Sequence, residues 1–369
     1  MFRFIYSFIY FVTLAFRKIG VDVIFYAPSH FNRGEYYENQ FFKPLISSCK
    51  KNNISYLILE EPSKGQHSRN NKSIPFDFIF LLIIILRKWM KVENDIIATE
   101  NKIGVLLSNT LFRNFRYKNY IVLSKSMISV FSTINKEAKL FDLQHGIIFT
   151  NKSDYFSNNI LSPHLERNNV SLLLSGSKFK ELLVKNGESN FVENNAHVIG
   201  VEVENKFLHK EANKHVLVTL QFTEDHTNSQ NKKLLEELEF VIDENRDLIF
   251  YLRNHPRFNN EVDLTRLYEF ENVQRANSDL YSNFPKCSLH LTAYSTTTFE
   301  CALLGIPTVF MQCLSDEFSM FKKDYDYPFN YSLVEVLNNY INCSNKVNNW
   351  AKSYYSDFNE DKFIKCLAL

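Results

Sequence analysis

Short apolar runs alternate with amphipathic stretches along the first half of this chain. Residues 21–27, VDVIFYA, and residues 54–59 have the composition of buried strands, and the apolar spacing of residues 36–50 between them is typical of a helix. The alternation continues with a helix expected over 178–185 and strands expected over 103–107, 120–123, 139–143, 170–174 and 197–199. Alternating strands and helices predict an α/β domain built on a parallel sheet.

The alternation pauses over residues 202–214, which are polar and charged, and then starts again. Strands are expected over 215–221, 247–252, 289–292 and 308–311, with an amphipathic helix over 231–244. A chain of 369 residues is long enough for two ordinary domains. We therefore predict two Rossmann-like, doubly wound parallel-sheet domains, over 1–205 (acceptor side) and 206–331 (donor side), which face a central cleft, and a helical segment over 332–369.

Two apolar runs, over 4–16 and 74–86, raise the question of a membrane. Each is shorter than the ~20 residues that span a bilayer, so we expect neither to be transmembrane. Both runs end in cations: Arg17 and Lys18 follow the first, and Arg87 and Lys88 follow the second. The pattern fits a core helix or an interfacial helix whose cations meet lipid head groups, and the core interpretation is favoured.

Composition narrows the range of partners and locations. The net charge of +1 gives no sign of a nucleic-acid partner, although the front half is basic and the back half acidic. The six cysteines show no CxxC pair and no metal-ligand spacing, and no cleavable signal pattern is visible. We expect a cytoplasmic protein and leave open a peripheral contact with the inner face of the plasma membrane.

Candidate chemistry lies in loops that follow predicted strands, where open α/β sheets bind ligands. The first is Asp142-Leu143-Gln144-His145-Gly146. We expect Gly146 to allow a tight turn, Gln144 and Gly146 to lie near an acceptor, and His145 to remove a proton from a hydroxyl with Asp142 orienting it. The alternative is a histidine satisfied by backbone groups.

The next two loops add charged groups. Glu224 and Asp225 follow the strand at 215–221 and are candidates for ligand or acceptor contact. The absence of a glycine-rich phosphate cradle there weakens a dinucleotide-cofactor interpretation. After the strand at 247–252 comes Arg253-Asn254-His255-Pro256-Arg257, in which the proline restrains His255 and both arginines can bind phosphate oxygens. The alternative is an exposed turn with solvated arginines.

The fourth loop lies within residues 287–311, CSLHLTAYSTTTFECALLGIPTVFM. This stretch predicts a strand, a hydroxyl-rich loop, a short helix, a Gly-x-Pro turn and a strand. Ser295, Thr296, Thr297 and Thr298 fall at the helix start, where unpaired N–H groups attract an anion, and Glu300 can accept hydrogen bonds from ribose. The alternative is that the hydroxyls only cap the helix.

Together these motifs resemble those of bacterial GT-B glycosyltransferases of capsule, O-antigen and lipooligosaccharide synthesis. The resemblance rests on Gln144-His145-Gly146, on His255-Pro256, and on Ser295-Thr296-Thr297 followed by Glu300 and Gly305-Ile-Pro307. The same trio is similar to elements of CDP-glycerol glycerophosphotransferases and of Kdo and sialic acid transferases. Two features depart from them: Ser295-Thr296 stands where those families have two serines, and the acidic base motif of the sialyltransferases is missing.

The resemblance implies a metal-independent transferase without a cofactor, which moves a sugar from a CMP-, CDP- or UDP-linked donor to a glycan or lipid-linked acceptor. By that resemblance His145 is the base, and His255, Arg253 and Thr296 stabilise the departing phosphate while Glu300 binds ribose. A polyol-phosphate transferase and a UDP-sugar epimerase remain alternatives on the same fold. A catalytically silent nucleotide-sugar-binding subunit is the alternative that is not an enzyme.

Overall fold

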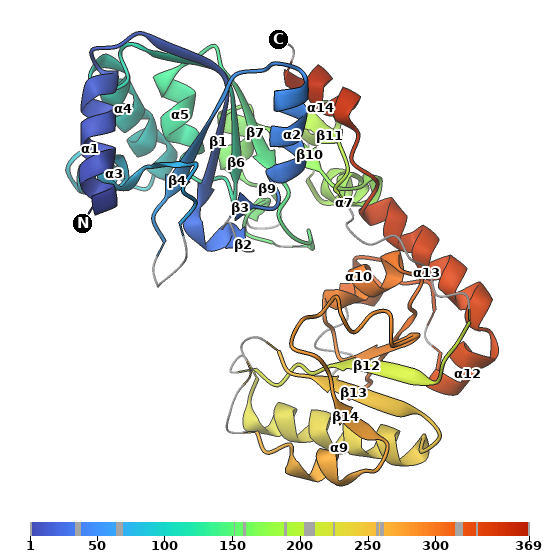
Figure 1. The fold of residues 1–369 in the computed structure, drawn as a ribbon. Helices are drawn as coiled ribbons and strands as arrows, with labels where there is room; N and C mark the ends of the chain where they lie inside the picture. Colours follow the sequence, from blue (N-terminus) through green and yellow to red (C-terminus); the bar gives the residue numbers. More distant parts are fainter. Residues whose placement is uncertain are drawn as a thin grey trace. The chain divides into compact units, whose positions relative to one another are not determined.

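The computed structural model divides the chain into two compact units. Unit 1 is Met1–Glu202 with Ser356–Leu369, and unit 2 is Val203–Tyr355 (Figure 1). The described residues are 2–33, 38–63, 69–150, 152–157, 160–187, 190–202, 211–223, 226–255, 258, 262–313, 320–329 and 331–367.

Unit 1 is built on a parallel sheet of order β11-β10-β7-β6-β1-β4-β5. Residues 23–26 of β1 are completely buried, because a strand in the middle of a parallel sheet is covered on both faces. The strands are β1 Ile19–Pro28, β4 Tyr56–Glu61, β5 Ile74–Pro75, β6 Phe115–Leu123, β7 Lys139–Leu143, β10 Ser171–Leu174 and β11 Ala196–Val198, and two small antiparallel pairs are β2 Asn32–Arg33 with β3 Glu38–Asn39 and β8 Phe156–Ser157 with β9 Ile160–Leu161.

Helices connect these strands, and one of them replaces a predicted strand. Residues 103–107 lie inside helix α4, so the strand expected there is wrong. Asp95 caps the start of α4 by accepting from the Ala98 N–H, and a short apolar run cannot by itself distinguish a strand from a buried helix. The helices of unit 1 are α1 Phe2–Leu14, α2 Lys43–Lys51, α3 Asp77–Trp89, α4 Ile96–Asn109, α5 Ile128–Ile134, α6 Pro163–Arg167, α7 Ser177–Gly187, α8 Phe191–Asn195 and α14 Glu360–Leu367.

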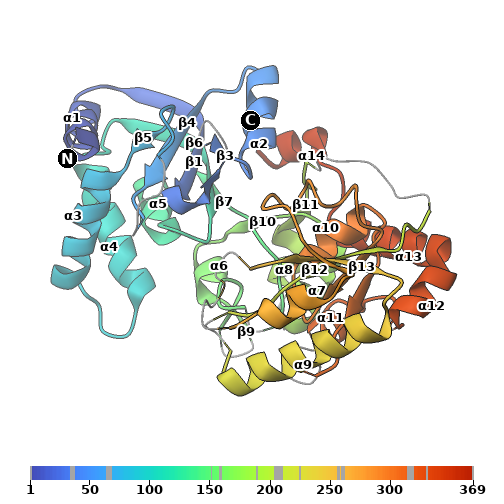
Figure 2. The ribbon, with the colours of Figure 1, turned by 60° about the horizontal axis from the view of Figure 1, so that its bottom comes forward.

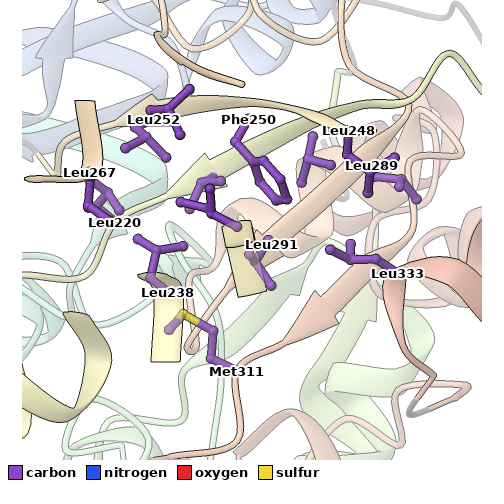
Figure 3. Close-up of a cluster of buried hydrophobic side chains, with 14 of the residues drawn as sticks. Leu220, Leu238, Leu248, Phe250, Leu252, Leu267, Leu289, Leu291, Met311 and Leu333 are labelled. Carbon is purple, nitrogen blue, oxygen red and sulfur yellow. The ribbon is translucent and has the colours of Figure 1, made fainter. Parts of the chain in front are cut away.

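Unit 2 is built on a parallel sheet of order β14-β13-β12-β15-β16. Leucines dominate its core, and Phe250 of β13 lies among them (Figure 3). The strand β14 was not predicted, because two of its three residues are exposed and polar. The elements are β12 His215–Thr219, α9 Asn228–Glu244, β13 Ile249–Arg253, β14 Val273–Arg275, β15 Leu289–Thr292, α10 Thr297–Leu303, β16 Thr308–Phe310, α11 Met320–Lys323, α12 Leu333–Asn338 and α13 Tyr340–Tyr354.

The C-terminal segment expected over 332–369 does not form a part of its own. Its first two helices, α12 and α13, belong to unit 2, where the Trp350 ring of α13 stacks on Phe299 of α10 at 4.8 Å. The chain then returns to unit 1, where the Val201 N–H donates to the Ser356 carbonyl oxygen. Gly200 lies against the same segment and has a positive φ. A Cβ added at Gly200 would lie 2.2 Å from the Asp357 carbonyl oxygen, so glycine is required at this position.

The two apolar runs form α1 and most of α3. Among the described residues, no helix is both long and apolar enough to cross a bilayer. Only Ser7, Phe11 and Leu14 of α1 are buried, and only Ile79 and Ile83 of α3. The interpretation of both runs as core helices is therefore wrong for their outward faces.

Candidate functional site

The candidate residues of unit 1 lie where β6 and β7 end. These strands are neighbours, and their register pairs Leu123 with Leu143, so the loops that follow them leave the sheet side by side. Carboxyl ends of parallel strands are the usual ligand edge of an open α/β sheet. The loop after β6 and the loop after β7 therefore form one site edge.

The loop after β6 has a strained backbone. Ser124, Lys125 and Met127 have φ values of 58°, 46° and 56°, the left-handed region that residues other than glycine seldom occupy. Such residues cost about 1–3 kcal/mol each and persist only where the surroundings hold them. They concentrate at functional sites, so this loop has a local signature of function that is independent of any motif.

His145 contacts this loop directly. Its Nε2 lies 3.1 Å from Ser124 Oγ, and its ring packs edge-on against Phe31 at 5.1 Å. Burial, with a smaller effect from the Lys152 charge, lowers the pKa of His145 to about 4. The imidazole is therefore neutral near pH 7, and burial makes it a weaker base than an exposed histidine.

Asp142 is hydrogen-bonded to the backbone of the same loop. Its carboxylate is buried, and Oδ1 accepts a hydrogen bond of 3.2 Å from the Lys125 N–H. Burial raises the pKa of Asp142 to about 7, the main opposing influence being that hydrogen bond. The hydrogen bonds found for Asp142 and His145 go to neighbouring residues of one loop, so Asp142 positions His145 through the loop and not by a direct contact.

Gln144 and Gly146 shape the turn around His145. The buried Gln144 amide accepts from the N–H and the hydroxyl of Ser175 at the end of β10, and donates to the Gly146 carbonyl oxygen at 2.8 Å. Gly146 does not have the positive φ that a glycine-specific turn requires, and an added Cβ would make only ordinary contact with Lys152 Nζ at 3.6 Å. Gln144 therefore acts as a structural brace, and the turn does not depend on glycine.

Three further groups at this edge were missed from the sequence. Lys152 donates from Nζ to the Ile147 carbonyl oxygen at 2.8 Å, and burial lowers its pKa. Glu61, the last residue of β4, accepts from the Tyr26 hydroxyl at 2.8 Å and from the Ser126 hydroxyl, and burial raises its pKa. Glu61 ends β4 and Ser126 lies in the loop after β6. The expectation that ligands bind at the carboxyl ends of strands, which was applied to His145, therefore applies to them as well.

The candidate residues of unit 2 lie at the corresponding edge of the second sheet. The register places Arg253 and Thr292 on either side of Thr219, the last residue of β12. Arg253 donates from Nη2 to the Ser278 carbonyl oxygen at 3.3 Å, whereas its buried Nε has no hydrogen bond in the described part of the chain. His255 is half-buried two residues further on. Predicted candidates Glu224, Asp225, Pro256 and Arg257 lie outside the described residues.

The hydroxyls before α10 divide into a surface pair and a buried pair. Ser295 Oγ accepts from the Thr297 N–H at 3.2 Å, so Ser295 caps the helix start. Thr297 and Thr298 are buried, whereas Ser295 is half-buried and Thr296 is exposed. Only Ser295 and Thr296 therefore present hydroxyls that a ligand can reach without rearrangement.

Glu300 lies in the first turn of α10, and one oxygen of its carboxyl group is buried. Its Oε2 is buried and finds no hydrogen-bond donor among the described residues, and burial raises its pKa to about 7. Buried polar atoms are nearly always paired, so an orphaned carboxylate oxygen calls for an explanation. A ligand hydroxyl is one partner that would satisfy it.

Two more histidines belong to this part of unit 2. His226 Nδ1 lies 3.2 Å from Asn231 Oδ1, and Nε2 hydrogen-bonds the Tyr294 hydroxyl, which joins the loop after β12 to the loop after β15. His290 is completely buried between Thr219 and Thr308, at 2.8 and 2.9 Å, and burial lowers its pKa to about 3. His290 is thus a structural bridge across three strands.

No set of three histidine, cysteine, aspartate or glutamate side chains able to hold a metal occurs among the described residues. The groups at the edge of unit 1 are a neutral imidazole and buried carboxyls, and those at the edge of unit 2 are an arginine, accessible hydroxyls and a buried carboxyl.

Comparison with solved structures identifies the architecture. The structure of S. aureus MnaA with UDP superposes with a TM-score of 0.54 at 10% identity, covering 93% of this chain and 95% of that one. The UDP-GlcNAc 2-epimerase of Neisseria meningitidis, bound to UDP-GlcNAc, gives 0.53 at 12% identity over 95% and 100% of the two chains. The chain has the GT-B fold.

The likeness extends to a polymerase with the same fold. A histidine-to-asparagine variant of the wall teichoic acid polymerase TagF gives a TM-score of 0.52 at 12% identity, covering 99% of this chain and 92% of that one. No family model matches this sequence, and no curated protein does. At these identities the likeness shows the GT-B fold alone.

Proposed function

We propose that this GT-B protein is a glycosyltransferase that moves a sugar from a nucleotide-activated donor to a hydroxyl of a glycan or lipid-linked acceptor. We assign it to the synthesis of a bacterial surface polysaccharide, such as a capsule, O-antigen or lipopolysaccharide. The observation that carries the proposal is the position of His145, which contacts Ser124 of a strained loop at the carboxyl-end edge of the first sheet.

His145 fits the role of general base. A neutral imidazole takes the proton from the acceptor hydroxyl as that oxygen bonds to the anomeric carbon of the donor sugar. The bond from the anomeric carbon to the phosphate oxygen breaks, and the nucleotide leaves with both electrons. Positioned bases of this kind contribute about 10²–10⁴-fold to the rate.

The edge of unit 2 fits the donor. Arg253 supplies a cation, and Ser295 and Thr296 supply hydroxyls for the phosphates, while His255 protonates or hydrogen-bonds the leaving phosphate. The buried Oε2 of Glu300 would accept from a ribose hydroxyl. These assignments give charge stabilisation to protein groups and require no metal.

Similar structures support a nucleotide-linked substrate. MnaA was solved with UDP, the Neisseria epimerase with UDP-GlcNAc, and TagF after a soak with CDPG. We extend this to donors linked to UDP, CDP or CMP. A polyol-phosphate transferase is the second candidate, since the TagF likeness covers 99% of this chain; epimerisation of a UDP-sugar is the third.

A donor screen followed by product analysis tests the proposal. Thermal unfolding is measured with CMP-, CDP-, UDP-, GDP- and dTDP-linked compounds, because a ligand that binds only the folded state raises the melting temperature. The stabilising donor is then incubated with and without acceptor glycans. Transfer of the sugar is expected. Transfer of a polyol phosphate or an epimerised nucleotide sugar would replace the proposal with the corresponding alternative, and binding without turnover would indicate a silent subunit.

A further inference from the structure

Helix α1 is apolar on its outward side as well as on its inward side, where Phe11 and Leu14 are buried. A helix on the surface of a protein in water turns its apolar side inward and its polar side outward. In α1 the inward positions include the polar Ser7, which is completely buried, whereas Ile5 and Ile9 face outward and Ile9 is 56% exposed. Phe2, at the start of the helix, is 87% exposed.

Helix α3 has the same arrangement. Ile79 and Ile83 are buried, while Leu81 and Ile85 are exposed on the other side, and Trp89 at the end of the helix is 85% exposed. Single exposed apolar residues are common, but several on the outward sides of two packed helices are not expected of a surface that meets only water.

Helices α1 and α3 are packed against each other and against unit 1, although their outward apolar side chains are exposed. The Phe78 ring of α3 packs edge-on against Phe4 at 5.9 Å and Phe8 at 5.0 Å, and the Phe78 N–H donates to Ser7 Oγ at 3.1 Å. Arg3 forms an ion pair with the buried Glu60 of β4. Figures 1 and 2 both show α1, α3 and α4 together on one side of unit 1.

Cations border these apolar faces. Arg17 and Lys18 are exposed just after α1, and Lys88 and Lys91 are exposed at and after the end of α3. The carboxylates carried by α3 and α4 are ion-paired, Asp77 with Arg69 and Glu100 with Arg87. Glu93 is exposed in the segment between α3 and α4, so the border carries these four exposed cations against one further exposed carboxylate, an excess of positive charge.

We propose that the outward faces of α1 and α3 dock onto the surface of an anionic lipid bilayer. This docking face consists of Phe2, Ile5, Ile9, Leu81, Ile85 and Trp89.

Three observations favour a bilayer as the occupant. Each helix has 13 residues, about 20 Å of helix, which is too short to span a bilayer but is sufficient to lie in its interface. Tryptophan and lysine at the end of α3 are the residues that anchor a helix at the head groups. The excess of cations attracts anionic head groups, whereas two copies of the face docked on each other would bring like charges together.

Flotation of the full chain with vesicles tests the proposal. Vesicles of phosphatidylglycerol and phosphatidylcholine are compared with vesicles of phosphatidylcholine alone. We expect the protein to float with the anionic vesicles, and the apparent affinity of Ile5→Gln/Ile9→Gln to fall at least tenfold. Lys88→Gln/Lys91→Gln should weaken binding to anionic vesicles and reduce its dependence on salt.

Matched controls come from unit 2. Phe240 on α9 and Ile341 on α13 are 64% and 65% exposed, so Phe240→Gln/Ile341→Gln removes comparable apolar surface elsewhere. Lys346→Gln/Lys352→Gln on α13 is the charge control. All of these positions are exposed, and thermal unfolding of each variant checks that it is folded.

Failure of the protein to float, or equal loss of binding in test and control variants, would overturn the proposal. Dimers that dissociate in Ile5→Gln/Ile9→Gln, without vesicle binding, would assign the face to a second copy of the chain. Donor binding and sugar transfer to a soluble acceptor are measured separately. The proposed reaction can therefore fail while the docking face stands, and the docking face can fail while the reaction stands.

Discussion

The candidate sites of the two units both lie at the carboxyl ends of parallel strands, but their chemistry is very different. The edge of unit 1 gathers titratable groups whose pKa values have moved: His145 to about 4, Asp142 to about 7, and Lys152 downward. The edge of unit 2 presents Arg253 and the hydroxyls before α10, and its one buried carboxyl with a raised pKa among those described is Glu300, at about 7. Groups with pKa values shifted apart by their surroundings are suited to moving protons, whereas a cation and hydroxyls are suited to holding phosphate.

The comparison predicts that removing the imidazole of unit 1 has the largest effect. In His145→Gln the side-chain amide can still hydrogen-bond Ser124 but cannot take a proton, so kcat should fall about 10²–10⁴-fold. His197→Gln is the matched control, since His197 on β11 is also partly buried and has a lowered pKa. Steady-state transfer assays measure both, and near-normal turnover of His145→Gln would remove the base from the mechanism.

Removing the cation of unit 2 should affect binding more than chemistry. Hydrogen bonds to charged groups contribute about 1.5–3 kcal/mol, so Arg253→Met should weaken donor binding about 10- to 100-fold. Arg246→Met, two residues after the end of α9, is the control for loss of an exposed arginine. Calorimetric titration of the donor measures both variants, and unchanged affinity of Arg253→Met would place the phosphates elsewhere.

A smaller loss of donor affinity is expected from Glu300→Gln. The amide of glutamine has one acceptor oxygen where the carboxyl of Glu300 has two, so the hydrogen bond from the ribose hydroxyl is weakened. This should cost about 0.5–1.5 kcal/mol of binding free energy, or roughly 2- to 12-fold in affinity. A donor with a 2′- and 3′-deoxy ribose separates the ribose role from a structural one. The loss should disappear for that donor; an equal loss for both donors would indicate a structural role for Glu300.

Asp142→Asn should change stability more than binding, and the effect should depend on pH. The folded pKa of about 7 lies above the ordinary value near 3.8, so the native state binds the extra proton between these values. The stabilising contribution of Asp142 is complete below about pH 4 and is lost as pH rises to about 7, by at most about 1.4 kcal/mol per pH unit.

Asparagine keeps an oxygen for the Lys125 N–H without a buried charge, so Asp142→Asn should become more stable relative to wild type as pH rises from 4 to 8. Urea unfolding at several pH values measures the difference. A constant difference across this range would mean that Asp142 titrates with an ordinary pKa.

The sequence predicted the alternation of elements because buried parallel strands are continuous apolar runs with clear ends, and the resemblance of its motifs predicted the GT-B fold. The strand over 139–143 has the observed bounds of β7. The error at 103–107 arose because Ile103 and Leu107 are one helical turn apart and both buried, so a short window could not distinguish the two periods.

The candidate site was less predictable. His145 could be proposed because it follows a strand, but its partner Ser124 and the left-handed backbone of Lys125 and Met127 depend on how the β6 loop packs. The amino-acid types of Lys125 and Met127 do not predict a positive φ, because it is imposed by the surrounding structure. The outward faces of α1 and α3 were misjudged for a similar reason, since hydrophobicity alone does not tell which neighbours cover a helix.

The most direct test of the central claim is the donor dissociation constant of His145→Gln, measured by calorimetric titration beside that of Arg253→Met. If unit 1 handles the proton and unit 2 holds the donor, His145→Gln should bind the donor within about twofold of wild type while Arg253→Met binds it at least tenfold more weakly. Loss of donor affinity in His145→Gln equal to that in Arg253→Met would contradict this division of roles.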